Sequence, residues 1–141
     1  MHYLYFIKKY LLFTLGFCFF TFYFSKAQDT TTVKTNKTVY GIASFYSDKF
    51  NGRKTGSGEI FNQTKFTAAS NRFSFGTWLK VTNLRNNKTV WVRVNDRMHP
   101  KMKRIVDLTR AAAQKIGMIS AGIAKVKVEV YGKTKPKDEE R

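Results

Sequence analysis

Three carboxylates are the residues of this chain best suited to chemistry. Asp96 follows the segment 89–94, in which apolar and polar residues alternate with the period of a half-buried strand. Asp107 follows the short apolar run 105–106, and Glu59 follows a glycine-rich loop. All three stand beside aromatic or aliphatic residues at element boundaries, where burial can raise the pKa of an acid. A protonated carboxyl can donate to a glycosidic oxygen, while an ionised one can steady an oxocarbenium ion or accept a proton.

On spacing alone, structural roles suit the two aspartates as well. Asp96 could cap a turn, and Asp107 could cap the helix that follows it. Other chemistries find less support, because His99 is the one histidine outside the N-terminal 27 residues and the single cysteine, Cys18, lies within them. The usual zinc ligand sets and a catalytic triad are therefore not expected, and the glycines have the wrong spacing for a phosphate loop. The sequence predicts no metal and no cofactor.

The first 27 residues have the pattern of a secretory signal peptide. Lys8 and Lys9 precede an apolar run from Tyr10 to Phe24, and small residues at 25 and 27 suit cleavage near Ala27. The run is shorter than the roughly 20 residues of a membrane-spanning helix, although an uncleaved anchor is the alternative. A lipid anchor at Cys18 is not expected, since Phe17 precedes it. We expect export to the periplasm or the cell surface.

The chain of 141 residues is strongly basic, with a formal net charge of +17. A basic surface favours polyanions such as nucleic acid, anionic lipid or acidic wall polymer. Export argues against nucleic acid as the partner and leaves an anionic wall or membrane surface. Dispersed charge can also serve solubility alone.

After a predicted flexible linker at 28–38, the pattern is that of one small all-β domain at 39–132 with a charged tail at 133–141. Strands are predicted at 39–46, 66–69, 77–83, 89–94, 105–106 and 125–131. One short helix is predicted at 110–116, with Thr109 as N-cap and Gly117 just past its end. Five or six short strands with one helix and no repeated strand–helix–strand unit indicate a small closed β-barrel.

Ordered blocks across residues 40–131 resemble the rare lipoprotein A (RlpA) family of septal-ring lytic transglycosylases. The blocks are Gly41–Tyr46, Phe50–Thr55, Gly58–Phe61, Thr67–Ala69, Phe75–Thr77, Val81–Leu84, Val92–Arg97 and Arg104–Thr109. The resemblance implies a six-stranded double-psi β-barrel, the fold of expansins, with one short α-helix. It also implies an exported, cofactor-free, monomeric enzyme that cleaves peptidoglycan glycan strands lacking stem peptides. The bond cut would join N-acetylmuramic acid to N-acetylglucosamine and leave a 1,6-anhydro end.

The resemblance also implies roles for individual residues. Asp96 is expected as the essential carboxyl and Glu59 as its catalytic partner. Asp107, which matches the catalytic acid of related expansin and cellulase barrels, is expected to hold the site in place or to cap the helix. The residues expected to line the groove are Tyr46, Asn62, Ser70 and Arg97.

Two positions depart from the family pattern and motivate an alternative function. Asn62 stands where the family has Asp, and Ser70 where it has His, so both lose proton-transfer capacity. The segment 98–100 also replaces a Gly-Pro pair, and nothing after Tyr131 resembles the family's C-terminal glycan-binding module. The alternative is a non-catalytic, expansin-like module that binds wall glycan.

Overall fold

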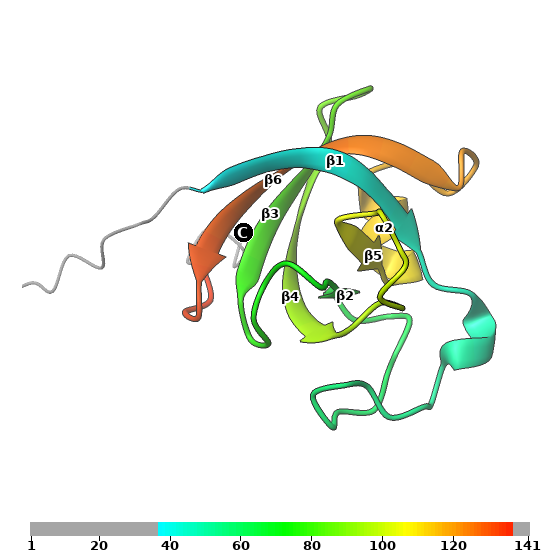
Figure 1. Ribbon diagram of the computed structural model, residues 1–141. Coiled ribbons are helices and arrows are strands. Elements are labelled where there is room, and N and C mark those ends of the chain that lie inside the picture. Colours follow the sequence, from blue (N-terminus) through cyan, green and yellow to red (C-terminus); the bar gives the residue numbers. More distant parts are fainter. Residues whose placement is uncertain (1–36, 137–141) are drawn as a thin grey trace, which may run out of the picture. The chain divides into compact units, whose positions relative to one another are not determined.

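The structure, a computed structural model, describes residues 37–136. The predicted signal peptide, nearly all of the predicted linker and the end of the predicted tail lie outside the described residues. Within these residues, six strands close into a barrel, with one α-helix and one turn of 3-10 helix in the connections (Figure 1). The strands are β1 (Thr38–Phe45), β2 (Thr67–Ala69), β3 (Trp78–Asn83), β4 (Thr89–Asp96), β5 (Val106–Leu108) and β6 (Ile123–Gly132), and the helices are η1 (Asp48–Phe50) and α2 (Arg110–Lys115).

The strands follow the order β1-β5-β2-β4-β3-β6 around the barrel. The pairs β1/β5 and β2/β4 are parallel, and the other four pairs are antiparallel. Both parallel pairs join strands that are not consecutive in the chain, so β5 is inserted between β1 and β2. The predicted closed barrel of six strands with one short α-helix is confirmed for the described residues. Among these residues, no helix has the length and apolar character needed to cross a membrane.

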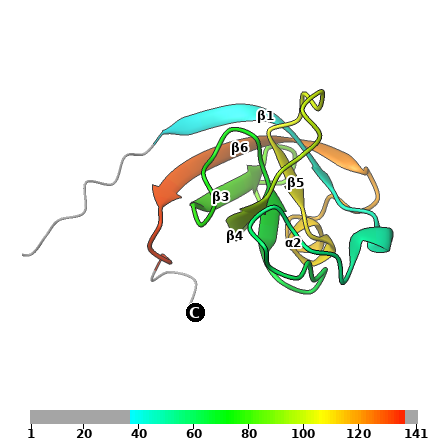
Figure 2. The ribbon, with the colours of Figure 1, turned by 60° about the horizontal axis from the view of Figure 1, so that its bottom comes forward.

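The barrel core is built from the alternating apolar residues of the strands. Leu79, Val92, Val94 and Val128 are fully buried, whereas the intervening residues of β3 and β4 reach the outer face. Burying an aliphatic side chain of this size contributes about 1.5–3 kcal/mol, so these positions hold the strands in register. The short helix α2 packs against β4 and β1 and closes one end of the barrel (Figure 2).

Strand β4 contains an irregularity directly before its last residue. Ala68 of β2 pairs with Val94, but Ala69 pairs with Asp96, so β4 has one extra residue at Asn95. Such bulges redirect side chains and are common next to active sites. The strand therefore runs two residues beyond its predicted end, and the sheet itself holds the backbone of Asp96.

Asp107 lies in the middle of β5, between Ser44 of β1 and Ala69 of β2. It does not cap α2, in contrast to the capping role expected from spacing. The N-cap of α2 is Thr109, as predicted, although its hydroxyl accepts no helix N–H and instead donates to the Lys65 carbonyl at 2.5 Å. Asp107 is thus fixed by a strand on each side.

Candidate active site

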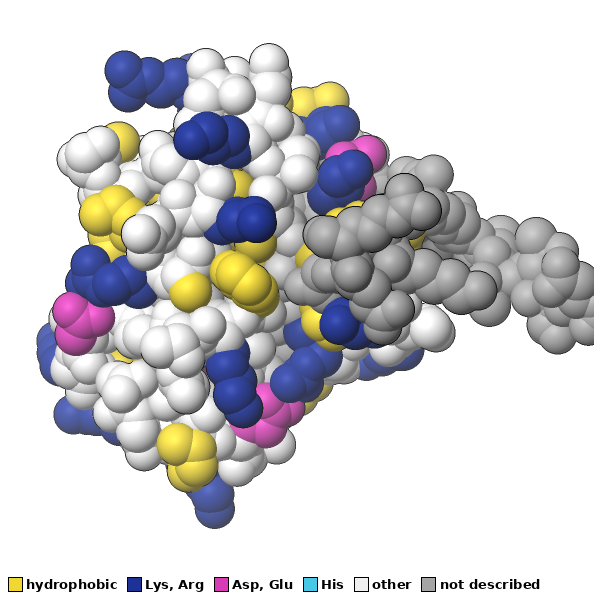
Figure 3. Space-filling view, turned by 180° about the vertical axis from the view of Figure 1, so that it is seen from behind, with side chains coloured by type: hydrophobic (Ala, Val, Ile, Leu, Met, Phe, Trp, Pro, Cys, Tyr) yellow, Lys and Arg dark blue, Asp and Glu magenta, His cyan; other side chains and the backbone are white. Residues whose placement is uncertain are grey.

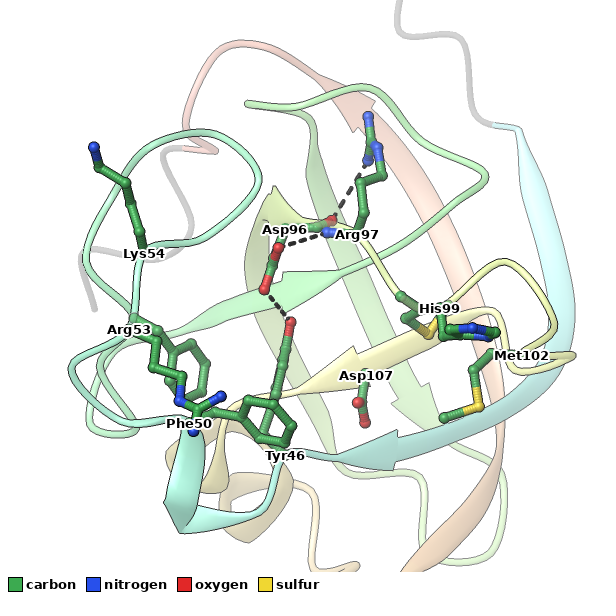
Figure 4. Close-up of a pocket in the computed structure, with 11 residues that line it drawn as sticks. Tyr46, Phe50, Arg53, Lys54, Asp96, Arg97, His99, Met102 and Asp107 are labelled. Atoms are coloured by element: carbon green, nitrogen blue, oxygen red, sulfur yellow. Dashed lines mark hydrogen bonds between the residues drawn. The ribbon is translucent and has the colours of Figure 1, made fainter.

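The aspartates of β4 and β5 meet in one cavity of about 450 Å³ at an end of the barrel (Figure 4). The cavity is bounded by the long β1–β2 connection on one side and by the β4–β5 connection on the other. Its lining residues are Tyr46, Phe50, Arg53, Lys54, Phe61, Asp96, Arg97, Met98, His99, Met102 and Asp107. Two carboxyl groups therefore face a space large enough for part of a sugar chain.

Asp96 accepts three short hydrogen bonds. Its Oδ1 receives the backbone N–H groups of Gly56 at 2.7 Å and Arg97 at 2.8 Å, and its Oδ2 receives the Tyr46 hydroxyl at 2.7 Å. A carboxylate has roughly four lone-pair sites, so these donors leave one direction for a further partner. The side chain is fixed in orientation and can still accept a proton.

Tyr46 follows β1 and carries the hydroxyl that reaches Asp96 (Figure 4). Its ring is buried against Phe61, with 4.5 Å between the ring centroids, and lies edge-on to Phe50. Burial, followed by the hydrogen bond to Asp96, raises the pKa of Tyr46 far above its usual value. The phenol therefore remains protonated and remains a donor to Asp96.

Asp107 has a different environment from Asp96. Its Oδ1 accepts the Ser44 hydroxyl at 2.5 Å. Burial raises the pKa of Asp107, and the charge of Asp96 raises it further, against the lowering effects of Ser44 and Arg104. Burial thus favours the protonated form of Asp107, which suits a proton donor.

Glu59, the predicted partner of Asp96, is not among the residues that line the cavity. Its carboxylate forms two parallel hydrogen bonds with Arg93, at 2.7 and 2.8 Å, and accepts a third from Asn95 at 3.2 Å. The side chain is 42% exposed, so the ion pair lies at the surface and not in the interior. The hydrogen bonds from Arg93 lower the pKa of Glu59 to about 2, in contrast to the raised pKa considered from sequence.

Arg97 lines the cavity, but its guanidinium is bound by other groups of the protein. It lies over the Phe75 ring at 3.8 Å from the centroid and donates to the carbonyls of Ser70 and Phe73. These contacts fix the connection between β2 and β3 beneath the end of β4. In Figure 4 its side chain points away from Asp107.

The two remaining predicted groove residues are not part of the cavity lining. Ser70 is fully buried, and its hydroxyl donates to the Ile105 carbonyl at 2.7 Å. Asn62 uses its side-chain oxygen to accept the backbone N–H and the hydroxyl of Thr64. Of the predicted site residues, the cavity therefore unites Tyr46, Asp96, Arg97 and Asp107.

Several functional residues were not found from sequence. Ser44 and Gly56 bond the two aspartates, but they lie 63 and 40 positions away along the chain. Only the parallel β1/β5 pairing sets Ser44 beside Asp107, and no local pattern carries that information. Residues 98–102 of the β4–β5 connection contribute Met98, His99 and Met102 to the cavity lining. The departure of 98–100 from the family pattern was a signal that could have pointed to a role of this segment in the site.

Two cationic side chains, Arg53 and Lys54, line the cavity from one loop, and His99 lines it from the opposite loop. Basic residues are also spread over the far side of the barrel, with few acidic groups among them (Figure 3). Within residues 37–136, no three His, Cys, Asp or Glu side chains cluster in a way that could hold a metal ion. The chemistry available to the described residues is carboxylate chemistry in a cationic surrounding.

Sequence comparisons show which proteins this chain is similar to. Residues 38–128 match the family described as lytic transglycolase. The chain is 52% identical over 90 residues to the endolytic peptidoglycan transglycosylase RlpA of Pasteurella multocida, covering 64% of this chain and 31% of the relative. It is 49% identical over 102 residues to the protein of the same name from Campylobacter jejuni, covering 72% and 37%. The chain thus spans about a third of the length of the curated relatives it matches.

Solved structures share the barrel. The apo-expansin of Clavibacter michiganensis superposes with a TM-score of 0.58 at 24% identity, over 71% of this chain and 53% of that one. The Streptomyces papain inhibitor superposes with a TM-score of 0.56 at 17% identity, over 67% and 94%. Proteins of such different names on one barrel show the fold alone, so function must be argued from the cavity.

Proposed function

The chain belongs to the lytic transglycolase family, and we propose that its barrel cleaves peptidoglycan glycan strands between N-acetylmuramic acid and N-acetylglucosamine. The single observation that carries this proposal is the cavity in which Asp96 and Asp107 meet under unlike conditions. Glycosidic bond cleavage needs one carboxyl that donates a proton and one that remains charged. The relatives' name supplies the glycan, and the cavity supplies the two carboxyls.

The proposed reaction needs no water and no cofactor. The Asp107 carboxyl gives its proton to the glycosidic oxygen, and the bond from that oxygen to the muramyl C1 breaks. The muramyl C6 hydroxyl closes on C1 and gives a 1,6-anhydro end. Asp96, which retains one open acceptor direction, takes the hydroxyl proton and steadies the positive charge that develops at C1. Proton exchange with solvent restores both groups.

The surrounding residues have supporting roles in this proposal. Tyr46 donates to Asp96 and holds its Oδ2 in place. Phe50 and Phe61 give the cavity apolar surface against which a sugar ring can pack. The cations Arg53 and Lys54 suit glycan strands that lack stem peptides, because such strands carry free lactyl carboxylates.

Digestion of stem-free glycan strands by the purified protein, with mass detection of anhydro-muropeptides, tests the proposal. We expect product from the wild type and loss of product from both Asp107→Asn and Asp96→Asn. Product that persists in both variants would refute the assignment of the two carboxyls. Tight sedimentation with purified sacculi without any soluble product would instead support the non-catalytic wall-glycan module.

We further propose that the chain is exported as a monomer, with a signal peptide removed after Ala27. The support is the pattern of residues 1–27, followed by the linker at 28–38. N-terminal sequencing of the protein from the envelope fraction should begin at Gln28. A start at Met1, or cytoplasmic retention, would contradict export by cleavage.

A further inference from the structure

The Glu59 side chain is bound by two residues of β4, with a further hydrogen bond to Ser57 of its own loop. Arg93 holds both carboxylate oxygens in a bidentate pair, and Asn95 donates to Oε2. Bidentate Arg–carboxylate pairs fix geometry as well as charge. An acid with a pKa of about 2 in this pair carries no proton to donate at neutral pH.

The backbone of Glu59 closes a tight loop over the end of β4. The Thr55 N–H donates to the Glu59 carbonyl at 2.8 Å, and the Gly58 N–H donates to the Thr55 carbonyl at 2.9 Å. Gly58 has a φ of +90°, a conformation that side chains with a Cβ rarely adopt. We call residues 55–59 the Gly56 loop.

The Gly56 loop touches Asp96 at one point. The Gly56 N–H donates to Asp96 Oδ1 at 2.7 Å, and the adjacent Ser57 N–H donates to the Asn95 carbonyl at 3.0 Å. A Cβ at position 56 would lie 3.1 Å from the Phe75 ring and 3.3 Å from Asp96 Oδ1. Only a glycine can bring its backbone this close without displacing the carboxylate or the ring.

The loop is therefore attached to β4 at both ends of its turn. One attachment is the pair of backbone contacts from Gly56 and Ser57, and the other is the Glu59 side chain on Arg93 and Asn95. Arg93 and Asn95 lie on the same strand that ends in Asp96. A force that holds Glu59 on β4 thus also holds Gly56 against Asp96.

We propose that Glu59 and Arg93 are positioning residues, a surface clamp that keeps the Gly56 N–H on Asp96 Oδ1, and that Glu59 takes no direct part in the reaction. The activity consequence rests on the proposed function, whereas the structural consequence does not. If Glu59 acts only through the clamp, Arg93 must be equally important, and the two residues must be exchangeable as a pair.

The test compares Glu59→Gln, Arg93→Gln, the double variant and the exchanged pair Glu59→Arg/Arg93→Glu in the full chain. We expect each single variant to lose about tenfold in anhydro-product rate, the double variant to lose no more than a single one, and the exchanged pair to recover most of the rate. Glu129→Gln is the matched control, because it breaks the similarly exposed Lys127–Glu129 pair on β6. That control should leave the rate unchanged.

Amide hydrogen exchange of Gly56 gives a readout independent of activity. Exchange should accelerate about tenfold in both single variants and return toward the wild-type rate in the exchanged pair. Unchanged Gly56 exchange in both single variants overturns the clamp. So does a Glu59→Gln variant that is as inactive as Asp107→Asn while Arg93→Gln retains full rate. If the wild type makes no product, the proposed function fails and the exchange measurement still decides the clamp.

Discussion

The two acids Glu59 and Asp107 show how differently one barrel treats carboxyl groups. Glu59 lies at the surface in an ion pair with Arg93, which lowers its pKa to about 2. Asp107 lies between two strands with a neutral hydroxyl partner, Ser44, and burial raises its pKa. A cation fixes charge and builds structure, whereas desolvation makes a proton available for chemistry. The environment of an acid, and not its presence in a motif, decides which of the two roles it can take.

The strongest test of this comparison is Asp107→Asn. The amide keeps the shape of the side chain but has no acidic proton, so we expect anhydro-product formation to fall by about 10²–10⁴-fold, the usual contribution of general acid catalysis. The unfolding midpoint should change little, which separates loss of chemistry from loss of fold. A rate within threefold of wild type would place the acid elsewhere.

The next largest effect is expected from Tyr46→Phe. This change removes the hydroxyl that donates to Asp96 Oδ2 at 2.7 Å and keeps the ring that packs on Phe61. A hydrogen bond to a charged group is worth about 1.5–3 kcal/mol, so the product rate should fall by roughly 10–100-fold. Tyr40→Phe is the matched control, because Tyr40 is 65% exposed on β1 and lies outside the cavity lining. Equal rates for the two variants would show that Asp96 does not need this donor.

A smaller effect is expected from Gly56→Ala. The added Cβ would lie 3.3 Å from Asp96 Oδ1 and 3.1 Å from the Phe75 ring, so the loop must shift by a few tenths of an ångström. We expect a reduction in rate of roughly three- to tenfold, with little change in glycan sedimentation. Gly52→Ala is a poor control because of its φ of +82°, so Ser74→Ala, at an exposed position outside the cavity lining, serves instead. An unchanged rate in Gly56→Ala would indicate that this close approach is not needed.

The smallest effect concerns stability against pH, and the two acids should act in opposite directions. Glu59 has a lower pKa when folded than its usual 4.5, so its contribution is present above pH 4.5 and is lost as the pH falls toward about 2. Glu59→Gln should remove this loss of stability at low pH. It should also lower the free energy of unfolding by about 0.2–1 kcal/mol near pH 7, the usual contribution of an exposed ion pair.

Asp107 has a raised pKa when folded, so its contribution is present at low pH and is lost as the pH rises from 3.8 through the folded value. Asp107→Asn should remove this dependence of the free energy of unfolding on pH. Urea unfolding midpoints from pH 2 to pH 8 measure both. Parallel curves for the two variants would contradict the distinction between the acids.

Much of the fold was predictable because alternation of apolar and polar residues reports burial directly. The segments at β3, β4 and β6 have clear period-2 patterns, and their inward residues Val81, Val92 and Val128 are fully buried. Boundaries were less predictable, since bulges and pairing partners are not local properties. The extension of β4 to Asp96 depends on its pairing with β2, which lies more than 20 residues earlier.

The candidate site was predictable only in part. Asp96, Asp107 and Tyr46 do line the cavity. The helix-capping role suggested for Asp107 rested on its neighbours in the chain, and the groove positions suggested for Ser70 and Asn62 rested on the family resemblance. In the barrel, Ser70 faces the Ile105 carbonyl in the interior, and Asn62 closes a turn. The partner of Ser70 comes from a distant segment that sequence spacing could not assign, whereas Asn62 is held by a local contact with Thr64.

By itself, the sequence determined the strands, the apolar core and the set of acids that could take part in catalysis. These depend on residue type and on the local alternation of apolar and polar residues. Only the tertiary structure decided which acids meet and in what environment. The physical reason is closure of the barrel, which brings Tyr46 to Asp96 across 50 positions and Ser44 to Asp107 across 63. The same closure leaves Glu59 outside the cavity lining, where its carboxylate forms an ion pair with Arg93.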